Sequence, residues 1–158
     1  MKLYFLRHGL AADRDEGAGD ADRSLTLQGR EKMVRQAAAM ARLGLEVDLI
    51  MTSPLLRARQ TADIVASKLK VLDKLVQDKR LGPGFGPGHL ADILGSSSGA
   101  KALMLVGHEP DMSETISFLI GGGRVLMKKG GLARVDICSV TELRGELIWL
   151  IPPAVMVL

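Results

Sequence analysis

The chain of 158 residues contains one cysteine, Cys138, so an intramolecular disulfide is excluded. The lack of disulfides is compatible with a reducing compartment, and the first apolar run is too short for a secretory signal. We therefore expect a cytoplasmic protein. Because Cys138 stands among apolar residues in "LARVDICSV", we expect it to be a small buried hydrophobe and not a nucleophile.

Aromatic residues are also scarce, with one Trp, one Tyr and three Phe. Nucleic acid partners favour aromatic stacking and a basic stripe, whereas here the formal charge is only +3 and the basic residues are spread among acids. The apolar carboxyl end "LIWLIPPAVMVL" is broken by Pro152 and Pro153 and is shorter than the ~20 residues of a bilayer span. We expect neither nucleic acid nor membrane as a partner, and the mild positive excess favours an anionic substrate.

Aliphatic residues, in contrast, are plentiful, and 47% of the residues are apolar. This is enough for one substantial core, so we expect a single domain over residues 1–158. Short apolar runs typical of buried strands alternate with helical patterns, and the chain ends in a predicted hairpin. Strands are predicted at 2–6, 47–52, 71–81, 101–107, 132–140 and 145–151, and helices at 25–44, 54–69, 89–94 and 110–120.

Two local signals mark where these elements begin. Ser53 followed by Pro54 is typical of a helix N-cap with proline at the first helical position. The stretch "GPGFGPGH" is rich in glycine and proline and predicts an irregular loop before the short third helix.

Alternating strands and helices predict an α/β fold. We expect a three-layer sandwich with a mostly parallel central sheet, helices on both faces and an antiparallel edge formed by the carboxyl-terminal hairpin. In such sheets ligands bind beyond the carboxyl ends of the strands. Three predicted strand ends carry polar groups: Arg7 with His8, then Thr52 and Ser53 leading to Arg57, and then His108.

Two arginines and two histidines at one sheet edge suit a phosphoryl group. Arginine offers a planar fork of donors, and Arg57 falls in the first turn of a helix, where free backbone N–H groups also favour an anion. A neutral histidine can be the nucleophile, and nearby arginines should lower the pKa of His8. His108 can donate a hydrogen bond to the charge that develops during transfer.

At these residues the sequence resembles the histidine phosphatase superfamily, which includes phosphoglycerate mutases and many phosphatases. "LYFLRHG" is similar to its opening strand and Arg-His-Gly signature, "MTSPLLRARQTADIV" to its second block and "LVGHEP" to its third. The short length and "DADRSLTLQGREKM" resemble the SixA group of phosphohistidine phosphatases, although Ser24 stands where proline is common.

The resemblance implies a hydrolase with the phosphoglycerate mutase-like fold that needs neither metal nor cofactor. His8 would accept the phosphoryl group, and Arg7, Arg57 and His108 would bind and stabilise it as further catalytic residues. Arg23 would reach the same pocket as a substrate-binding residue. The substrate would be a phosphorylated protein, either a histidine phosphocarrier or a signalling domain, or else a small phosphorylated metabolite.

The chain departs from the superfamily in one respect. Its mutases and broad phosphatases carry an acid after the third strand that protonates the leaving group, and "LGPGFGPGHL" has none. Asp78, Asp92 and Glu109 are the nearest carboxylates in sequence. Imidazole, with a pKa of ~6.5, is a much better leaving group than an alkoxide, so phosphohistidine should need less help.

Three alternatives stay open at this stage. The first is a small-molecule phosphomonoesterase or mutase of the same superfamily, and the second is a catalytically silent phosphate-binding module. The third is a metal hydrolase built from His8, His89 and His108 with Asp22, Glu109 or Asp111. A nucleotide-binding P-loop, in contrast, is excluded because no G-x-x-x-x-G-K-[ST] motif occurs.

Overall fold

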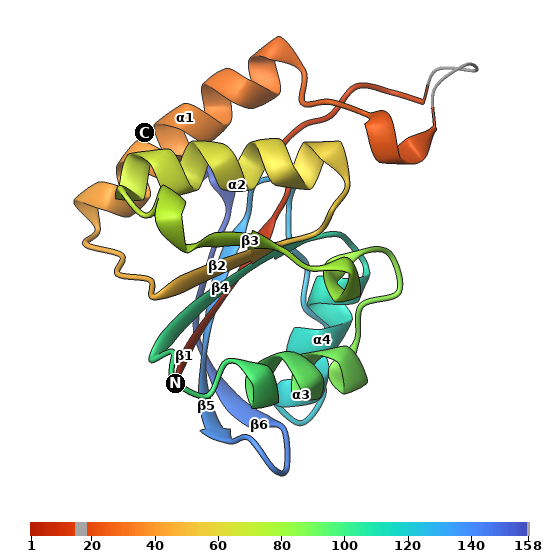
Figure 1. Cartoon of the computed structure of the whole chain (residues 1–158), viewed down its shortest axis with the longest axis vertical. Coiled ribbons are helices and arrows are strands. Elements are labelled where there is room, and N and C mark those ends of the chain that lie inside the picture. Colours follow the sequence, from red (N-terminus) through yellow and green to blue (C-terminus); the bar gives the residue numbers. More distant parts are fainter. Residues whose placement is uncertain (15–18, 158) are drawn as a thin grey trace.

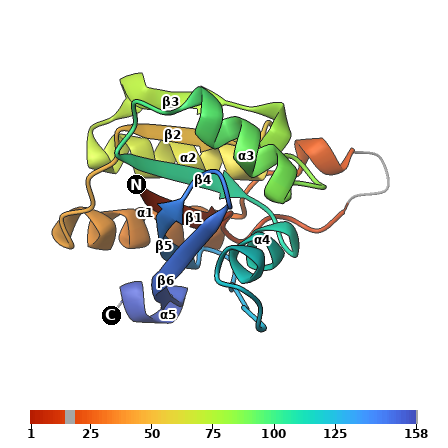
Figure 2. The ribbon, with the colours of Figure 1, turned by 90° about the horizontal axis from the view of Figure 1, so that it is seen from below.

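The computed structural model describes residues 1–14 and 19–157 and forms within them one six-stranded sheet. The strand order is β3-β2-β4-β1-β5-β6, which Figure 2 shows from one edge of the sheet to the other. Strands β3, β2, β4 and β1 are parallel, whereas β5 and β6 form an antiparallel hairpin at the edge. The strands are β1 (Lys2–Arg7), β2 (Leu49–Thr52), β3 (Leu75–Gln77), β4 (Ala102–Gly107), β5 (Leu132–Ser139) and β6 (Arg144–Ile151).

Helices cover both faces of the sheet, and the predicted three-layer α/β fold is confirmed (Figure 1). Helices α1 and α2 lie on one side, and α3 and α4 lie on the other. The α-helices are α1 (Leu27–Arg42), α2 (Leu56–Leu69), α3 (Pro87–Ser96), α4 (Asp111–Leu119) and α5 (Pro153–Met156). Three 3-10 turns join them: η1 (Asp20–Asp22), η2 (Leu72–Lys74) and η3 (Lys79–Leu81).

The two faces of the central strands fill two cores. Side chains alternate along a strand, so Tyr4 and Leu6 of β1 pack with α1 and α2, while Leu3 and Phe5 pack with α3 and α4. All six residues of β4 are buried because both faces of this strand are covered. This burial explains why the central strands appear in the sequence as short continuous apolar runs.

Strand register brings the carboxyl ends of β1, β2 and β4 together. Arg7 pairs with Gly107, and Thr52 pairs with Val106. The backbone continues this alignment one residue further, since His8 N–H donates to the Gly107 carbonyl (3.1 Å) and Ser53 N–H to the Val106 carbonyl (2.9 Å). The residues that follow these strands therefore leave the sheet at the same place.

Helix α1 lies close to the segment after His8. Thr26 is its N-cap and accepts a hydrogen bond from the Gly29 N–H (2.9 Å). A Cβ atom at position 29 would stand 2.1 Å from the carbonyl oxygen of Leu10, so only glycine fits there. The missing side chain allows the first turn of α1 to contact the backbone that carries the site.

Two predicted helix starts are wrong. Ser53 is not the N-cap of α2, because its N–H still pairs with β4 and the chain turns into the helix only at Leu56. The third helix instead begins earlier, inside the predicted loop. Pro87 occupies its first turn, where the fixed φ of proline suits a helix.

Cys138 is exposed, so the prediction of a small buried residue is wrong. It lies near the end of β5, where the pairing with β6 is irregular between Ile137 and Ser139. The hairpin is an edge of the sheet there, and no second layer covers this side chain. Among the described residues, no helix has the length and apolar character needed to cross a membrane.

Candidate active site

The polar side chains at the three strand ends converge. The rings of His8 and His108 lie with their centroids 5.2 Å apart, and the charges of Arg7 and Arg57 act on both rings. His8, Arg57 and His108 are only 7%, 6% and 5% exposed. The structure therefore gathers two arginines and two histidines, which lie far apart in the sequence, at the carboxyl edge of the parallel strands.

In the ring of His8, one nitrogen forms a hydrogen bond to the backbone and the other keeps a lone pair that can attack phosphorus. Its Nδ1 lies 2.7 Å from the carbonyl oxygen of Gly9, which can only accept, so Nδ1 carries the proton and Nε2 keeps its lone pair. The Gly9 N–H donates to Thr61 Oγ1 (3.1 Å), and this hydroxyl donates to the Arg57 carbonyl (2.8 Å). Helix α2 thereby holds the segment that orients the His8 ring.

The predicted lowering of the His8 pKa has a different main cause. Burial lowers the pKa of His8 to about 3, and the charges of His108, Arg57 and Arg7 add less to this effect. Burial is also the main cause that lowers the pKa of His108 to about 4. Both rings are neutral near pH 7.

These pKa values predict that the protein loses stability as the pH falls from about 7 to 5. Both rings have folded pKa values below the ordinary 6.5, so the unfolded chain takes up more protons in this range. The loss should reach up to about 1.4 kcal/mol per pH unit for each ring. Urea unfolding in phosphate-free buffer measures it, with the exposed His89→Gln as the matched control. Stability that stays constant between pH 6.5 and 5 would contradict both pKa values.

Two buried nitrogens of the site have no protein partner. Arg7 donates from NH1 to the Met127 carbonyl (2.7 Å), but its Nε is buried without a hydrogen bond. His108 contacts Ser53 Oγ through Nε2 (2.7 Å), and its Nδ1 is likewise buried and unpartnered. Unpaired buried polar atoms are costly, and only one other side-chain atom in the described part of the chain, Gln36 Oε1, shares this condition. A ligand that accepts hydrogen bonds would satisfy both nitrogens.

Arg57 is held by a residue that the sequence analysis missed. Its NH1 donates to the Asp20 backbone carbonyl (2.7 Å) and its NH2 to Asp20 Oδ2 (3.1 Å). Arg23 also binds Asp20, through NH1 and Oδ1 (2.9 Å), and its Nε donates to the Ala12 carbonyl (2.8 Å). Arg23 therefore reaches the cluster through Asp20. The sequence contained one indication of the pairing between Asp20 and Arg23, because the two residues stand three positions apart around a turn.

The carboxylates around the site are engaged in hydrogen bonds. Hydrogen bonds from Arg23 and then from Arg57 lower the pKa of Asp20 to about 2. Glu109 accepts from the Ser113 N–H and hydroxyl, and Asp111 accepts from the Gly84 N–H (2.7 Å). Asp78 forms an ion pair with Arg80, which leaves it no free oxygen to serve a distant substrate.

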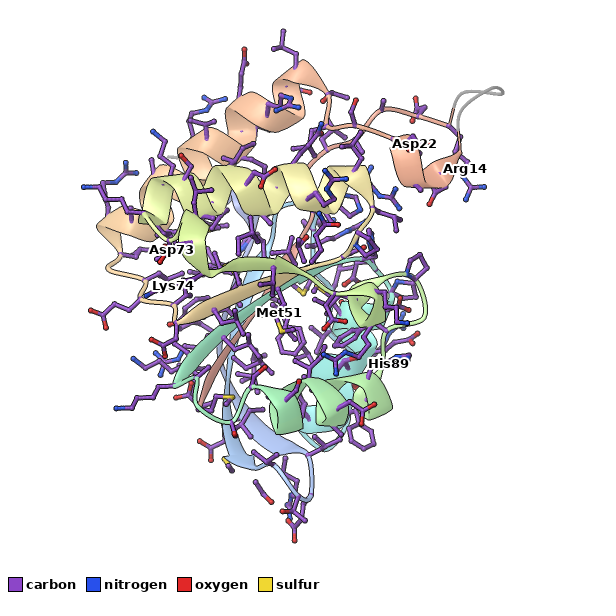
Figure 3. The ribbon with its side chains drawn as sticks, in the orientation of Figure 1. Arg14, Asp22, Met51, Asp73, Lys74 and His89 are labelled. Carbon is purple, nitrogen blue, oxygen red and sulfur yellow. The ribbon has the colours of Figure 1, made fainter. Side chains whose placement is uncertain are left out.

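His89, the third histidine of the metal-hydrolase alternative, is exposed, whereas His8 and His108 are buried. It lies on α3, while Asp22 lies on η1 near Arg14 (Figure 3). Across residues 1–14 and 19–157, three or more His, Cys, Asp or Glu side chains do not gather at any point in a way that could hold a metal ion.

Comparison with known proteins agrees with this geometry. Residues 3–82 match the model of the histidine phosphatase superfamily, branch 1. An uncharacterized protein of Picosynechococcus sp. is 41% identical in an alignment of 142 residues that covers 84% of this chain and 82% of that protein.

Two solved structures have the same fold. The protein histidine phosphatase SixA complexed with tungstate has a TM-score of 0.88 at 23% identity, over 99% of both chains. The putative phosphohistidine phosphatase SixA from Agrobacterium tumefaciens has a TM-score of 0.81 at 26% identity, over 96% of this chain and 98% of that one. The chain belongs to the histidine phosphatase superfamily, branch 1, and is a phosphatase of that family.

Proposed function

We propose that this phosphatase removes the phosphoryl group from phosphohistidine in a protein, by way of a covalent intermediate on His8. One observation carries the proposal. Arg7 Nε and His108 Nδ1 are buried nitrogens without a protein partner, next to a neutral imidazole that keeps a free lone pair on Nε2. A phosphoryl group has oxygens for the donors and a phosphorus atom for the nucleophile.

The reaction would proceed in two displacements. The substrate ring is first protonated by solvent on the nitrogen that does not carry phosphorus. His8 Nε2 then forms a bond to phosphorus while the bond from phosphorus to the substrate ring breaks, so that this imidazole departs neutral and the phosphorylated His8 keeps its Nδ1 proton. Water then attacks the phosphorus atom, the P–N bond to His8 breaks, and His8 returns to its neutral Nδ1–H form. One proton of the water stays on the released phosphate, and the other goes to phosphate or to solvent. Arg7, Arg57 and His108 would hold the phosphoryl oxygens during both steps.

The ionisation and hydrogen bonding of the nearby carboxylates favour a substrate whose leaving group needs no proton from the enzyme. Asp20, with its pKa of about 2, is ionised near neutral pH and has no proton to donate. Glu109 and Asp111 already accept hydrogen bonds from protein groups. An alkoxide would need a proton from the enzyme at this point, whereas a phosphorylated imidazole can take its proton from solvent on the other ring nitrogen and then leave neutral.

The partner we propose is a phosphorylated histidine phosphocarrier or signalling domain. Support comes from the likeness to the Agrobacterium tumefaciens structure, which is described as a putative phosphohistidine phosphatase. A small phosphorylated metabolite is the alternative, and the substrate comparison below distinguishes the two.

The test compares kcat/KM on phosphohistidine, phosphoaspartate and phosphoserine peptides and on an aryl phosphate. We expect phosphohistidine to exceed phosphoserine by at least about 10²-fold, the lower range of what a general acid supplies. Equal values on the two peptides would overturn the proposal. The assays are repeated with EDTA, where we expect unchanged rates, and loss of activity that zinc restores would instead favour a metal hydrolase.

A further inference from the structure

Ser53 contacts the ring of His108 at the centre of the site. It follows β2 directly, is 0% exposed, and its N–H is bonded to the Val106 carbonyl (2.9 Å). Its Oγ lies 2.7 Å from His108 Nε2 and also accepts a hydrogen bond from the Leu55 N–H (3.2 Å). The hydroxyl is thus fixed by the strand end on one side and by the turn into α2 on the other.

The protons of this contact can be assigned from its partners. A neutral imidazole has one N–H and one lone pair, and phosphoryl oxygens only accept. If the unpartnered His108 Nδ1 is to bond a phosphoryl oxygen, it must carry the proton, and Nε2 must then accept. The partner of Nε2 is the Ser53 hydroxyl, whose oxygen already accepts from Leu55 and whose proton is free to be donated.

We propose that Ser53 is a positioning residue that holds His108 in the Nδ1–H tautomer, so that the ring presents a donor to the transferred phosphoryl group. The inference rests on the proposed phosphatase chemistry. It adds a residue that fixes the tautomer of His108, which the two histidines cannot do by themselves. Without the hydroxyl, the proton of His108 is free to move to Nε2, and a lone pair would then face the phosphoryl oxygens.

A doubly protonated His108 is the competing state, because Ser53 would then only accept. The surroundings disfavour it. The ring is buried, it lies beside His8, and the positive charges of Arg57 and Arg7 act on it. Burial and these charges lower its pKa to about 4, although the charges of Asp111 and Asp20 act in the opposite direction.

Nitrogen-15 NMR of the wild-type protein tests the tautomer directly. The chain has three histidines, so the signals of His108 can be assigned with two single variants, His89→Gln and His8→Gln, each of which removes the signals of one other histidine. We expect His108 to show the Nδ1–H pattern at pH 7, both alone and with inorganic phosphate. An Nε2–H pattern, or an imidazolium, in the phosphate complex would overturn the inference. This result does not depend on which substrate the enzyme prefers, so it stays decisive if the phosphohistidine specificity fails.

Kinetics of Ser53→Ala supply the second test. We expect kcat to fall by about 10²-fold with little change in KM, since one donor to the transition state is lost, and His108 to move to the Nε2–H pattern. Ser53→Thr keeps a hydroxyl and should recover part of the rate. Ser97→Ala removes a buried hydroxyl whose one side-chain hydrogen bond, within the described part of the chain, is to Met51 Sδ (3.9 Å), and it should keep kcat within about threefold. A Ser53→Ala enzyme with wild-type kcat would overturn the inference.

Discussion

Replacing His8 with alanine is expected to lower kcat/KM by at least about 10⁴-fold, because no other group can take over the attack on phosphorus. His108 cannot substitute for it. Its Nε2 contacts Ser53, and its Nδ1 serves as a donor in the arrangement described above. The variant should also lose the proposed covalent intermediate, which we expect to trap in the wild-type protein as a phosphoryl label that is stable in base and lost in acid.

The matched control is His89→Ala, which removes an exposed histidine of α3 and should keep both activity and label. A His8→Ala protein that still acquires an acid-labile label would move the nucleophile to another residue. A wild-type protein that binds phosphate but never acquires the label would instead be a silent binding module. The two failures are distinguishable because phosphate binding is measured separately by calorimetry.

The convergence of the site could be predicted because parallel strands end at a common edge. Arg7, His8 and His108 directly follow apolar runs, and a run of this kind is what a strand buried on both faces requires. Arg57 could be added because a helix begins shortly after β2. In each case the local sequence pattern places the residue at or just after a strand end, and the parallel topology of the sheet brings these strand ends together.

The contacts between these groups could not be predicted, because they depend on side-chain directions and loop paths. Asp20 reaches Arg57 across a separation of 37 residues, and Ser53 reaches His108 across 55. Ser53 also has a strong helix-capping signal, and the sequence alone favoured that local role. The structure shows that strand pairing to Val106 keeps Ser53 in the sheet, which frees its hydroxyl for the histidine.

The same limit applies to burial and its electrostatic effect. Charge patterns in the sequence suggested that arginines lower the pKa of His8, yet burial is the larger cause. The degree of burial depends on distant segments that contact the end of β1, such as Thr61 of α2 and the backbone of Gly130, and the periodicity of the sequence does not describe these contacts. Cys138 is the opposite case, since its apolar neighbours in sequence do not place it under a second layer.

Arg57→Ala is expected to lower kcat/KM by about 10³-fold. The guanidinium is a charged, planar donor next to both histidines, and its loss also removes one of the cations that balance the charge of Asp20, which then keeps its contact with Arg23. Arg57→Lys keeps the charge without the fork of donors and should recover only part of the rate. Arg59→Ala, in the same helix but exposed, is the matched control and should stay within about threefold of the wild type.

Asp20→Asn distinguishes a role of Arg57 in phosphate binding from a role in holding η1. If Arg57 served mainly to anchor this turn, removing the Asp20 charge would cost as much activity as removing Arg57. If instead Arg57 binds the phosphoryl group, Asp20 competes for the same donors, and Asp20→Asn should lower the inhibition constant for inorganic phosphate while kcat changes little. Equal losses in the Asp20→Asn and Arg57→Ala enzymes would therefore remove Arg57 from the chemistry and make it a structural residue.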